Sequence, residues 1–545
     1  MSMPRMTSGG AHKYKVLVAD AVDQAGIDIL KSIAEVDVKT KQPEDALIQM
    51  IGDYDAMMVR SATTVTAKII EAGKKLKIIA RAGVGVDNVD IKAATERGVF
   101  VVNSPSGNTI AAAEHTLAMM FASARLIPAA DASVRGHKWE RASFMGRQLN
   151  GKVLGIVGLG QVGGHVAKVA REVGMRLVGY DPYVNEARAA SMHVELLPLE
   201  DLLKEVDFLT LHIPLIPATK HLLNAEKLAM MKPTARIINC ARGGVIDESA
   251  LSDALKAGKL GGAALDVFEV EKAFPEDHPL LHCPNIVLTP HLGASTVEAQ
   301  VNVAVDVAQQ IRDCLLGHLP DSAVNIPGLR ASELADMKEL LDLASIMGQI
   351  ASQTLIGAIE KVTCTLEGDY AAVTSHPLML AATKGALSPN SAVPINFVNV
   401  SQIAERNRIL MSVAKESQRQ KPRIRVKVSS HEHSSEMAGT LTDDGEFLMV
   451  AFMGVPIYMP IQRKKGDAYY VYSKHDDKPG LLAKLTTVLG DAGYNIGNMH
   501  LGRTVEVRPL GIAIASLDKE CEAPLLEKIK KVMGENLLET NSFSI

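Results

Sequence analysis

The chain has 545 residues and a net charge of −4, so its surface carries no excess of positive charge. Nucleic-acid binding and attachment to anionic membranes both rely on basic surfaces, and the composition argues against both classes. The length exceeds what a single hydrophobic core organises and predicts about three or four domains, whose partners are small molecules.

The cysteines do not indicate a metal site or a disulfide framework, because none has CxxC or CxxH spacing; the five are Cys240, Cys283, Cys314, Cys364 and Cys521. This usage favours a reducing compartment. The first dozen residues are polar, and no run of about 18 apolar residues follows. We therefore predict a soluble, cytoplasmic protein without a bound metal.

Strands and helices alternate from the start of the chain. Residues 14–105 contain the apolar segments KVLVAD, DAMMVRS, LKIIARAG and VFVVNSP, with helical stretches between them. This alternation predicts a doubly wound parallel sheet. A helical pattern follows at 110–126, and a later one at about 296–316 is expected to return the chain to this sheet. We predict a substrate-binding domain made of 14–105 and 298–325.

Residues 152–181 read as one strand, a glycine turn, an amphipathic helix and a second strand. Gly158 permits a tight turn, Gly160 lets a pyrophosphate approach the backbone, and Gly163 lets the helix pack closely on its strand. Asp181 ends the second strand, where its carboxylate would accept hydrogen bonds from ribose hydroxyls and repel a 2′-phosphate. The unit predicts binding of NAD rather than NADP.

Three polar side chains follow three strands of the domain predicted at 106–297. Arg242 comes after ARIINC, Glu271 after AALDVF, and His291 after IVLTP. Ligands of such sheets bind beyond the carboxyl ends of the strands. Hydride transfer from a hydroxy acid needs a base for the hydroxyl proton and a cation for the carboxylate, which histidine and arginine suit. We predict His291 as acid/base, Glu271 as its partner and Arg242 as substrate anchor.

The last third of the chain loses the strict alternation. Residues 326–462 mix helices with the segments KVTCTLEG, RIRVKVSS, EFLMVAFM and VPIYMP, which predicts an α+β domain. A polar stretch at 463–467 precedes residues 468–545, whose order of strands and helices is βαββαβ, the ferredoxin-like plan. The predicted fold class is therefore two doubly wound Rossmann-like domains followed by an α+β domain and a ferredoxin-like domain.

Several sequence motifs also resemble those of a known family. NCARGGVIDESAL, AALDVFEVE and TPHLGASTVEAQ resemble the D-isomer-specific 2-hydroxyacid dehydrogenases. RAGVGVDNVD, NSPSGNTIAAAEHT and WERASFMG are similar to its long, phosphoglycerate-oxidising members, which add an intervening allosteric domain and an ACT domain. The resemblance runs nearly continuously over residues 14–325. It implies NAD-dependent oxidation of 3-phosphoglycerate to 3-phosphohydroxypyruvate, the first step of the phosphorylated pathway to L-serine.

The resemblance assigns roles residue by residue. Its catalytic set falls on Arg242, Glu271 and His291. Its dinucleotide contacts fall on Gly158, Gly160, Gln161, Val162, Gly163, Asp181, Cys240, Ala241, Asp266, Gly293 and Ala294. A phosphorylated substrate asks for further cations, and the matching positions are Arg60, Arg81 and Arg141, joined by Asn108. An L-serine effector would contact His475, Asp477 and Asn495.

Other interpretations stay open at this point. A glyoxylate or hydroxypyruvate reductase of the same family would share the catalytic residues without needing phosphate cations, and an NAD-sensing adaptor of corepressor type would share the fold. The basic run from Arg419 to Lys427 is either a solvated strand edge or an anion site. The resemblance also implies a homo-oligomer, dimer or tetramer, in which the segment 139–146 reaches a neighbour's cleft.

Overall fold

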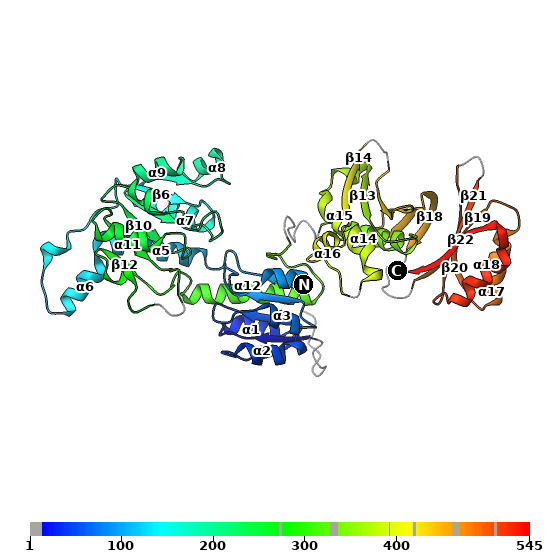
Figure 1. The fold of residues 1–545 in the computed structure, drawn as a ribbon, viewed down its shortest axis with the longest axis horizontal. Coiled ribbons are helices and arrows are strands. Elements are labelled where there is room, and N and C mark those ends of the chain that lie inside the picture. The colour runs from blue at the N-terminus through cyan, green and yellow to red at the C-terminus, as the bar shows by residue number, and fades with distance from the viewer. Residues whose placement is uncertain are drawn as a thin grey trace.

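The computed structural model describes residues 14–271, 275–326, 336–391, 393–417, 421–461, 468–505 and 509–545. Four sheets follow one another, and Figure 1 shows each with its own helices along an elongated chain. The predicted fold class is confirmed: two parallel sheets are followed by a mixed sheet and an antiparallel one. Between 14 and 545, residues 327–335 and 462–467, which include the polar stretch at 463–467, lie outside the described residues.

The first sheet is parallel, with strand order β2-β1-β3-β4-β5. Alternate residues of β1 enter two separate cores, because successive side chains of a strand point to opposite faces. Helices α1 and α12 cover one face, and α2, α3 and α4 cover the other. The elements are β1 (Tyr14–Val18), α1 (Gln24–Lys31), β2 (Ala34–Val38), α2 (Glu44–Met50), η1 (Ile51–Asp53), β3 (Ala56–Val59), α3 (Ala67–Ala72), β4 (Ile78–Arg81), α4 (Ile91–Glu96), β5 (Phe100–Val102) and α12 (Val297–Leu315).

The second sheet is also parallel, with order β12-β11-β10-β9-β6-β7-β8, so the chain reverses direction across the sheet beside β6. Such a switch point is where a doubly wound sheet binds its ligand. Its strands are β6 (Val153–Val157), β7 (Arg176–Tyr180), β8 (Glu195–Leu196), β9 (Phe208–Leu211), β10 (Arg236–Asn239), β11 (Gly262–Leu265) and β12 (Ile286–Leu288). Its helices are α5 (Thr109–Arg125), α7 (Gln161–Glu172), α8 (Glu186–Ser191), α9 (Leu199–Glu205), α10 (Ala225–Ala229), α11 (Glu248–Lys256) and η3 (Pro279–His282).

A short helical arm follows α5. Leu126 has a left-handed backbone with φ of 56°, which ends α5 and starts α6 (Ile127–Arg135) in a new direction. No residue of α6 is buried, and the helix projects from the second sheet in Figure 1. The turn η2 (Arg141–Phe144) follows it. Within the described residues no single helix is long and apolar enough to cross a membrane, and only α5 with α6, bent by 63°, meets that test by length and composition.

The third sheet has the order β14-β13-β15-β16-β17-β18 and is antiparallel except where β13 meets β14. Two of its strands, β14 and β16, were not expected from the sequence. The elements are α14 (Lys338–Gln353), β13 (Lys361–Glu367), η4 (Gly368–Ala372), α15 (Ser375–Leu387), η5 (Ser388–Asn390), α16 (Val400–Arg406), β14 (Leu410–Glu416), β15 (Arg423–Ser429), β16 (Ser434–Leu441), β17 (Phe447–Phe452) and β18 (Val455–Ile461).

The fourth sheet is antiparallel with order β20-β21-β19-β22, as βαββαβ requires. One face carries its two helices, whereas the other joins the core of the third sheet through Phe452, Tyr470, Tyr472 and Phe543. Phe452 meets Tyr472 edge-on at 5.3 Å, and Tyr470 stacks on Phe543 at 5.0 Å. The elements are β19 (Tyr469–Asp476), α17 (Leu481–Asp491), β20 (Ile496–Arg503), β21 (Leu510–Leu517), α18 (Ala523–Met533), η6 (Gly534–Asn536) and β22 (Leu537–Ser544).

Candidate active site

The glycine turn after β6 has the geometry expected of a dinucleotide site. Gly158 has a φ of +95°, which other residues rarely adopt, and a Cβ at Gly163 would lie 2.0 Å from the carbonyl oxygen of Gly158. A Cβ at Gly160 would meet no protein atom within 4 Å. The first and third glycines therefore shape the turn, while the second leaves open space beside the start of α7 for an anion.

Asp181 is tied to this turn by the backbone. Its carboxylate accepts hydrogen bonds from the N–H groups of Leu159 (2.8 Å) and Tyr183 (2.9 Å). The side chain of Gln161, the first residue of α7, accepts from the hydroxyl of Thr109 at the start of α5 (3.1 Å), and Val162 packs against the core behind the turn. The glycine turn and the acidic end of β7 thus form one continuous edge.

The glycine geometry predicts that one substitution lowers stability and another weakens NAD binding. Gly163→Ala is expected to lower the free energy of unfolding by about 1–3 kcal/mol, because its methyl group overlaps the Gly158 carbonyl. Gly160→Ala is expected to leave the melting temperature unchanged while weakening NAD binding, since its methyl group fills only the open space. Thermal unfolding and calorimetric titration with NAD separate the two effects. Equal melting temperatures for both variants would contradict the packing argument.

His291 and Glu271 form the predicted pair. Nδ1 of His291 lies 2.8 Å from Oε2 of Glu271, and both side chains are partly exposed. Burial alone would raise the pKa of Glu271, but the hydrogen bond and charge of His291 outweigh it, so this pKa lies below its usual range. The backbone of His291 is left-handed, with φ of 55°, and its N–H donates to the carbonyl of Asp266 (2.9 Å). Nε2 is thereby left to face a substrate proton.

Three of the predicted arginines converge. Arg242, after β10, contacts Asp87 of the first sheet through an ion pair of 3.4 Å, and its guanidinium lies against Gly85. The charges of Arg242 and Arg60 both act on Arg81, at the end of β4, and the charge of Arg242 also acts on Glu271. The charges of Arg60, Arg81 and Arg242 therefore lie near enough to act on one another, and Arg242 links them to Glu271.

Several buried polar atoms in and near this cation cluster lack a hydrogen-bond partner among the described residues. Burial first, and then the nearby charge of Arg242, lower the pKa of Arg81 to about 10, which still leaves the guanidinium charged at neutral pH. Nε of Arg81, Oγ of Ser104 and Oδ1 of Asn108 are buried without a hydrogen-bond partner. Ser104 is joined to the Arg81 loop because its N–H donates to the carbonyl of Gly83 (3.0 Å). Buried polar atoms are normally paired, so this region is built for a polar ligand.

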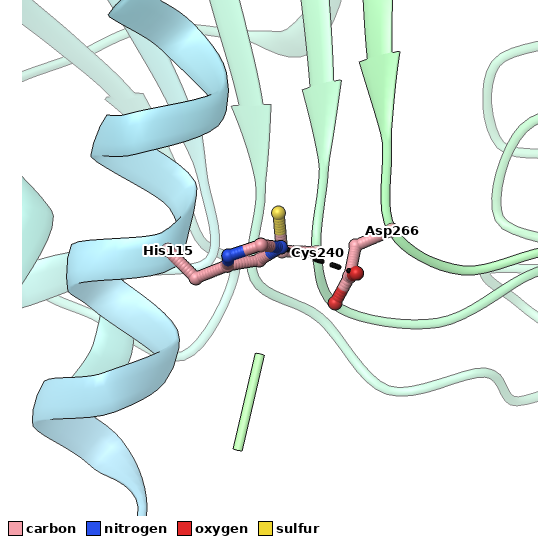
Figure 2. Close-up of side chains that lie close together, drawn as sticks. All are labelled: His115, Cys240 and Asp266. Atoms are coloured by element: carbon pink, nitrogen blue, oxygen red, sulfur yellow. Dashed lines mark ion pairs between the residues drawn. The ribbon is translucent and has the colours of Figure 1, made fainter. Parts of the chain in front are cut away.

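Asp266 is the centre of a hydrogen-bond network, and Figure 2 shows its ion pair with His115. Its carboxylate, fully buried, accepts from Thr289 Oγ1 (2.6 Å) and from the N–H groups of Leu292 and Gly293 (both 2.8 Å), and it lies 3.1 Å from Nε2 of His115. Burial raises the pKa of Asp266, but these donors together hold it below its usual range. The side chain of Asp266, a predicted dinucleotide contact, therefore also fixes the loop that begins at His291 and runs through Ala294.

His115, Cys240 and Asp266 offer three metal-ligand atoms within 4.8 Å of one another. In Figure 2 the three side chains point toward a common centre between α5 and the strand ends. Burial, reinforced by the charge of Asp266, raises the pKa of the Cys240 thiol to about 12, whereas metal ligation uses the thiolate. The carboxylate of Asp266 is also occupied by protein donors. The arrangement favours a hydrogen-bonded network over a metal centre.

The raised pKa makes Cys240 a poor nucleophile. At pH 8 the thiol is expected to react with iodoacetamide at least ten-fold more slowly than an exposed cysteine, because the thiolate is the reactive form. Peptide mass spectrometry of native and urea-unfolded protein measures the difference at this residue. Rapid labelling of Cys240 in the native protein would contradict the buried network.

The predicted residue Arg141 lies apart from the other arginines. It begins η2, beyond the projecting helix α6, and its side chain is exposed. Arg242 and Arg60 are among the charges that act on Arg81, whereas Arg141 is not. Trp139 and Met145, on either side of it, are 80% and 85% exposed. The structure of one chain therefore does not bring Arg141 into the cleft.

The predicted effector residues do not lie together: His475 and Asp477 lie at one end of the fourth sheet, whereas Asn495 lies at the other, because Ile496 and Tyr469 both pair with Leu517. His475 is buried against Gly511, its Nδ1 faces the carbonyl of Asp476 (2.8 Å), and its Nε2 is buried without a partner. Asp477 forms an ion pair of 2.9 Å with Arg503, and Asn495 is exposed. Only the histidine therefore presents an unmet polar atom of the kind that an effector would satisfy.

The basic run of the third sheet is not a strand edge, and its interpretation as an anion site stays a prediction. Arg423 and Arg425 both form ion pairs with the fully buried carboxylate of Glu367, and Arg425 also reaches Glu416 (3.2 Å). Their strand, β15, lies inside the sheet between β13 and β16, so it is no edge. Arg419 lies outside the described residues. These two cations are committed to an internal acid.

Some functional positions were not predicted from the sequence. Asp87 joins the two sheets through Arg242, and Thr289 with His115 completes the network of Asp266. His115 lies on a helix with many buried apolar residues, a pattern that indicates packing rather than a functional role. The signal that would have identified it is the pairing of a helix histidine with an acid that follows a strand, which only the folded chain brings together.

Family models match the chain in three places. Residues 117–293 match the D-isomer specific 2-hydroxyacid dehydrogenase NAD binding domain, residues 336–453 match the D-3-phosphoglycerate dehydrogenase intervening domain, and residues 469–532 match the ACT domain. NAD is therefore the cofactor of the second sheet, and the glycine turn fits that assignment. The chain limits of the four predicted domains stay predictions.

Relatives span nearly the whole chain. The D-3-phosphoglycerate dehydrogenase of Synechocystis is 48% identical over 525 residues, covering 95% of this chain and 93% of its own. The Bacillus subtilis enzyme of that name is 37% identical, covering 95% of this chain and 98% of its own. Among solved structures, a Thermus thermophilus protein (TM-score 0.53, 36% identity) covers 57% of this chain and 99% of its own. A Paecilomyes thermophila glyoxylate reductase (TM-score 0.53, 28% identity) covers 57% of this chain and 98% of its own.

Proposed function

Because the chain belongs to the D-3-phosphoglycerate dehydrogenases, within the D-isomer-specific 2-hydroxyacid dehydrogenase family, we propose that it oxidises 3-phosphoglycerate to 3-phosphohydroxypyruvate with NAD. The observation that carries the choice of substrate is the convergence of Arg60, Arg81 and Arg242 beside the His291–Glu271 pair. A carboxylate and a phosphate on one small molecule need more cations than a simple hydroxy acid. This oxidation is the first step toward L-serine.

The chain's own groups divide the work. Arg242 holds the carboxylate of the substrate, and Arg81 with Arg60 holds the phosphate. Glu271 accepts a hydrogen bond from Nδ1–H of His291, which leaves Nε2 to take the proton of the 2-hydroxyl group as the ketone forms. NAD, when bound, accepts the hydride that leaves C2. The turn at Gly158, Gly160 and Gly163, with Asp181, would hold the dinucleotide at the edge of the same sheet.

Initial rates with matched substrates test the proposal. NADH formation from 3-phosphoglycerate is measured beside NADH oxidation with phosphohydroxypyruvate, hydroxypyruvate and glyoxylate. A strong preference for the phosphorylated pair is the expected result. Preference for glyoxylate or hydroxypyruvate would overturn the choice of substrate, and a reductase with the same catalytic residues would replace it. An absence of turnover with all four would favour an adaptor that binds NAD without catalysis.

Regulation by L-serine rests on the fourth sheet. The unpartnered Nε2 of His475, at the end of β19 and before the start of α17, supports an effector site there. Asp477 would exchange its ion pair with Arg503 for the ammonium group of the amino acid. Inhibition by L-serine that disappears in His475→Ala is expected. Equal inhibition of both proteins would place the effector elsewhere.

The arm supports the proposal that the chain forms a homo-oligomer. Helix α6 buries none of its residues, and the exposed Trp139 and Met145 lie beside it, so an apolar surface remains for a second copy. Pairing through the arm would bring Arg141 of one subunit toward the cleft of the other, which accounts for its distance from Arg60 and Arg81. Analytical ultracentrifugation of the intact protein and of Trp139→Glu distinguishes a dimer built this way from a monomer.

A further inference from the structure

The catalytic pair depends on the loop that follows β11. Glu271 reaches His291 from this loop, and within the described residues its carboxylate otherwise accepts only a long bond of 3.4 Å from the N–H of Phe268. Its side chain is 37% exposed, so packing alone does not fix its rotamer. The backbone on either side must therefore hold the carboxylate in place.

One buried carboxylate is bonded to a backbone N–H before Glu271 and to a side chain that follows it in the chain. Glu248 is the first residue of α11, and Oε1 accepts a hydrogen bond from the N–H of Glu269 (2.7 Å). Its Oε2 lies 3.0 Å from Nε2 of His278, which directly precedes η3. The loop is thus held two residues before Glu271 and again where η3 begins.

His278 is oriented to donate to Glu248. The N–H of Leu280 donates to Nδ1 of His278 (3.4 Å), which assigns the ring proton to Nε2. The ring meets Phe268 edge-on, with centroids 6.3 Å apart. Glu269, itself paired with His221 at 3.1 Å, is the other charged group that faces Glu248. Burial raises the pKa of Glu248, and the N–H of Glu269 partly offsets this effect.

Burying a carboxylate costs desolvation free energy, and the proposed reaction does not use the carboxylate of Glu248 directly. We infer that Glu248, together with His278, is a positioning residue that fixes the loop from which Glu271 orients His291. This inference rests on the proposed function for its reaction, because it assigns a support to the acid/base pair of that reaction. Glu248 is buried at the start of α11, and within the described residues its carboxylate is hydrogen-bonded to Glu269 and His278 rather than to His291 or Arg242.

A double-mutant cycle tests whether Glu248 acts through Glu271. Glu248→Ala is expected to lower kcat by roughly ten-fold to a hundred-fold, with less than about a three-fold change in KM for NAD, and Glu248→Gln to lose less, because its amide oxygen still accepts one bond. In a Glu271→Gln background, Glu248→Ala is expected to cause almost no further loss, since residues that act as a unit are non-additive. The pH profile of kcat/KM in Glu248→Ala should resemble that of Glu271→Gln.

The neighbouring residue supplies a matched control. Asp247 caps α11 by accepting from the N–H of Ala250 (3.0 Å), and it makes no hydrogen bond or ion pair with the described residues of the loop. Asp247→Ala is expected to lower the melting temperature while leaving kcat and the pH profile unchanged. Additive losses for Glu248→Ala and Glu271→Gln, or an unchanged pH profile with a fall in melting temperature, would overturn the positioning role.

A second measurement needs no turnover and separates this inference from the proposed function. Diethyl pyrocarbonate modifies accessible imidazole nitrogens, and peptide mass spectrometry gives the rate at His291. Glu248→Ala and Glu271→Gln are expected to change that rate by the same factor, relative to the unchanged Asp247→Ala. A rate in Glu248→Ala equal to that of the unaltered protein would overturn the inference, whichever substrate the enzyme proves to use.

Discussion

Replacing His291 by alanine is expected to lower kcat by roughly a hundred-fold to ten-thousand-fold, the range that a positioned general base contributes. The side chain is partly exposed in the cleft and is held at Nδ1 by Glu271, so its loss removes the proton acceptor without opening the core. Steady-state rates with 3-phosphoglycerate measure the loss, and calorimetric titration measures NAD binding, which is expected to stay unchanged.

Glu271→Gln serves as the graded control for that result. The amide keeps the shape of the side chain but not its charge, so kcat should fall less than in His291→Ala. Because the pKa of Glu271 lies below its usual value of 4.5, the carboxylate stays ionised at every pH above about 5. Its titration therefore does not account for changes of activity in that range. Near-normal turnover in His291→Ala would remove the acid/base assignment.

Replacing Arg60 and Arg81 together by alanine is expected to raise KM for phosphohydroxypyruvate by about a hundred-fold or more. Each charge-assisted hydrogen bond to the phosphate contributes about 1.5–3 kcal/mol, and two are removed. Hydroxypyruvate lacks the phosphate, so its KM should change by less than about five-fold. Rates of NADH oxidation with the two ketoacids give this ratio directly.

A third arginine of the same domain controls for the loss of charge. Arg97 ends α4 and donates to the carbonyl of Gly73 (3.4 Å), away from the converging cations. Arg97→Ala should leave both KM values unchanged. Equal increases for the two ketoacids in the double variant would mean that Arg60 and Arg81 do not bind phosphate, and would favour the hydroxypyruvate reductase.

The parts that the sequence predicts well depend on local signals. The strand, glycine turn and helix at 153–172 can be recognised from the sequence. The strand appears as a run of apolar residues, and the positive φ of the turn and the close packing of the helix each require glycine. Arg242, Glu271 and His291 were identifiable because parallel strands end at a common edge, so residues after separate strands meet there.

The parts that it misses depend on partners distant in the chain. β14 is largely exposed, and β16 is rich in serine, glycine and alanine, so neither has the alternating apolar pattern of a strand; pairing with β13, β15 and β17 creates both. The contact of Glu248 with His278 joins residues 30 positions apart, and the contact of His115 with Thr289 joins residues 174 apart. The hydrophobic periodicity of a sequence does not indicate such distant pairs.

The aromatic contact between the third and fourth sheets constrains which substitutions can occur together in evolution. Phe452 is on one sheet, while Tyr470, Tyr472 and Phe543 are on the other, yet all four share one core. A change of size at one ring must be matched at another, because interiors are packed too tightly to absorb it. We therefore expect these positions to vary together among relatives, and an exchange of the last sheet for that of a distant relative to require Phe452 to change with it.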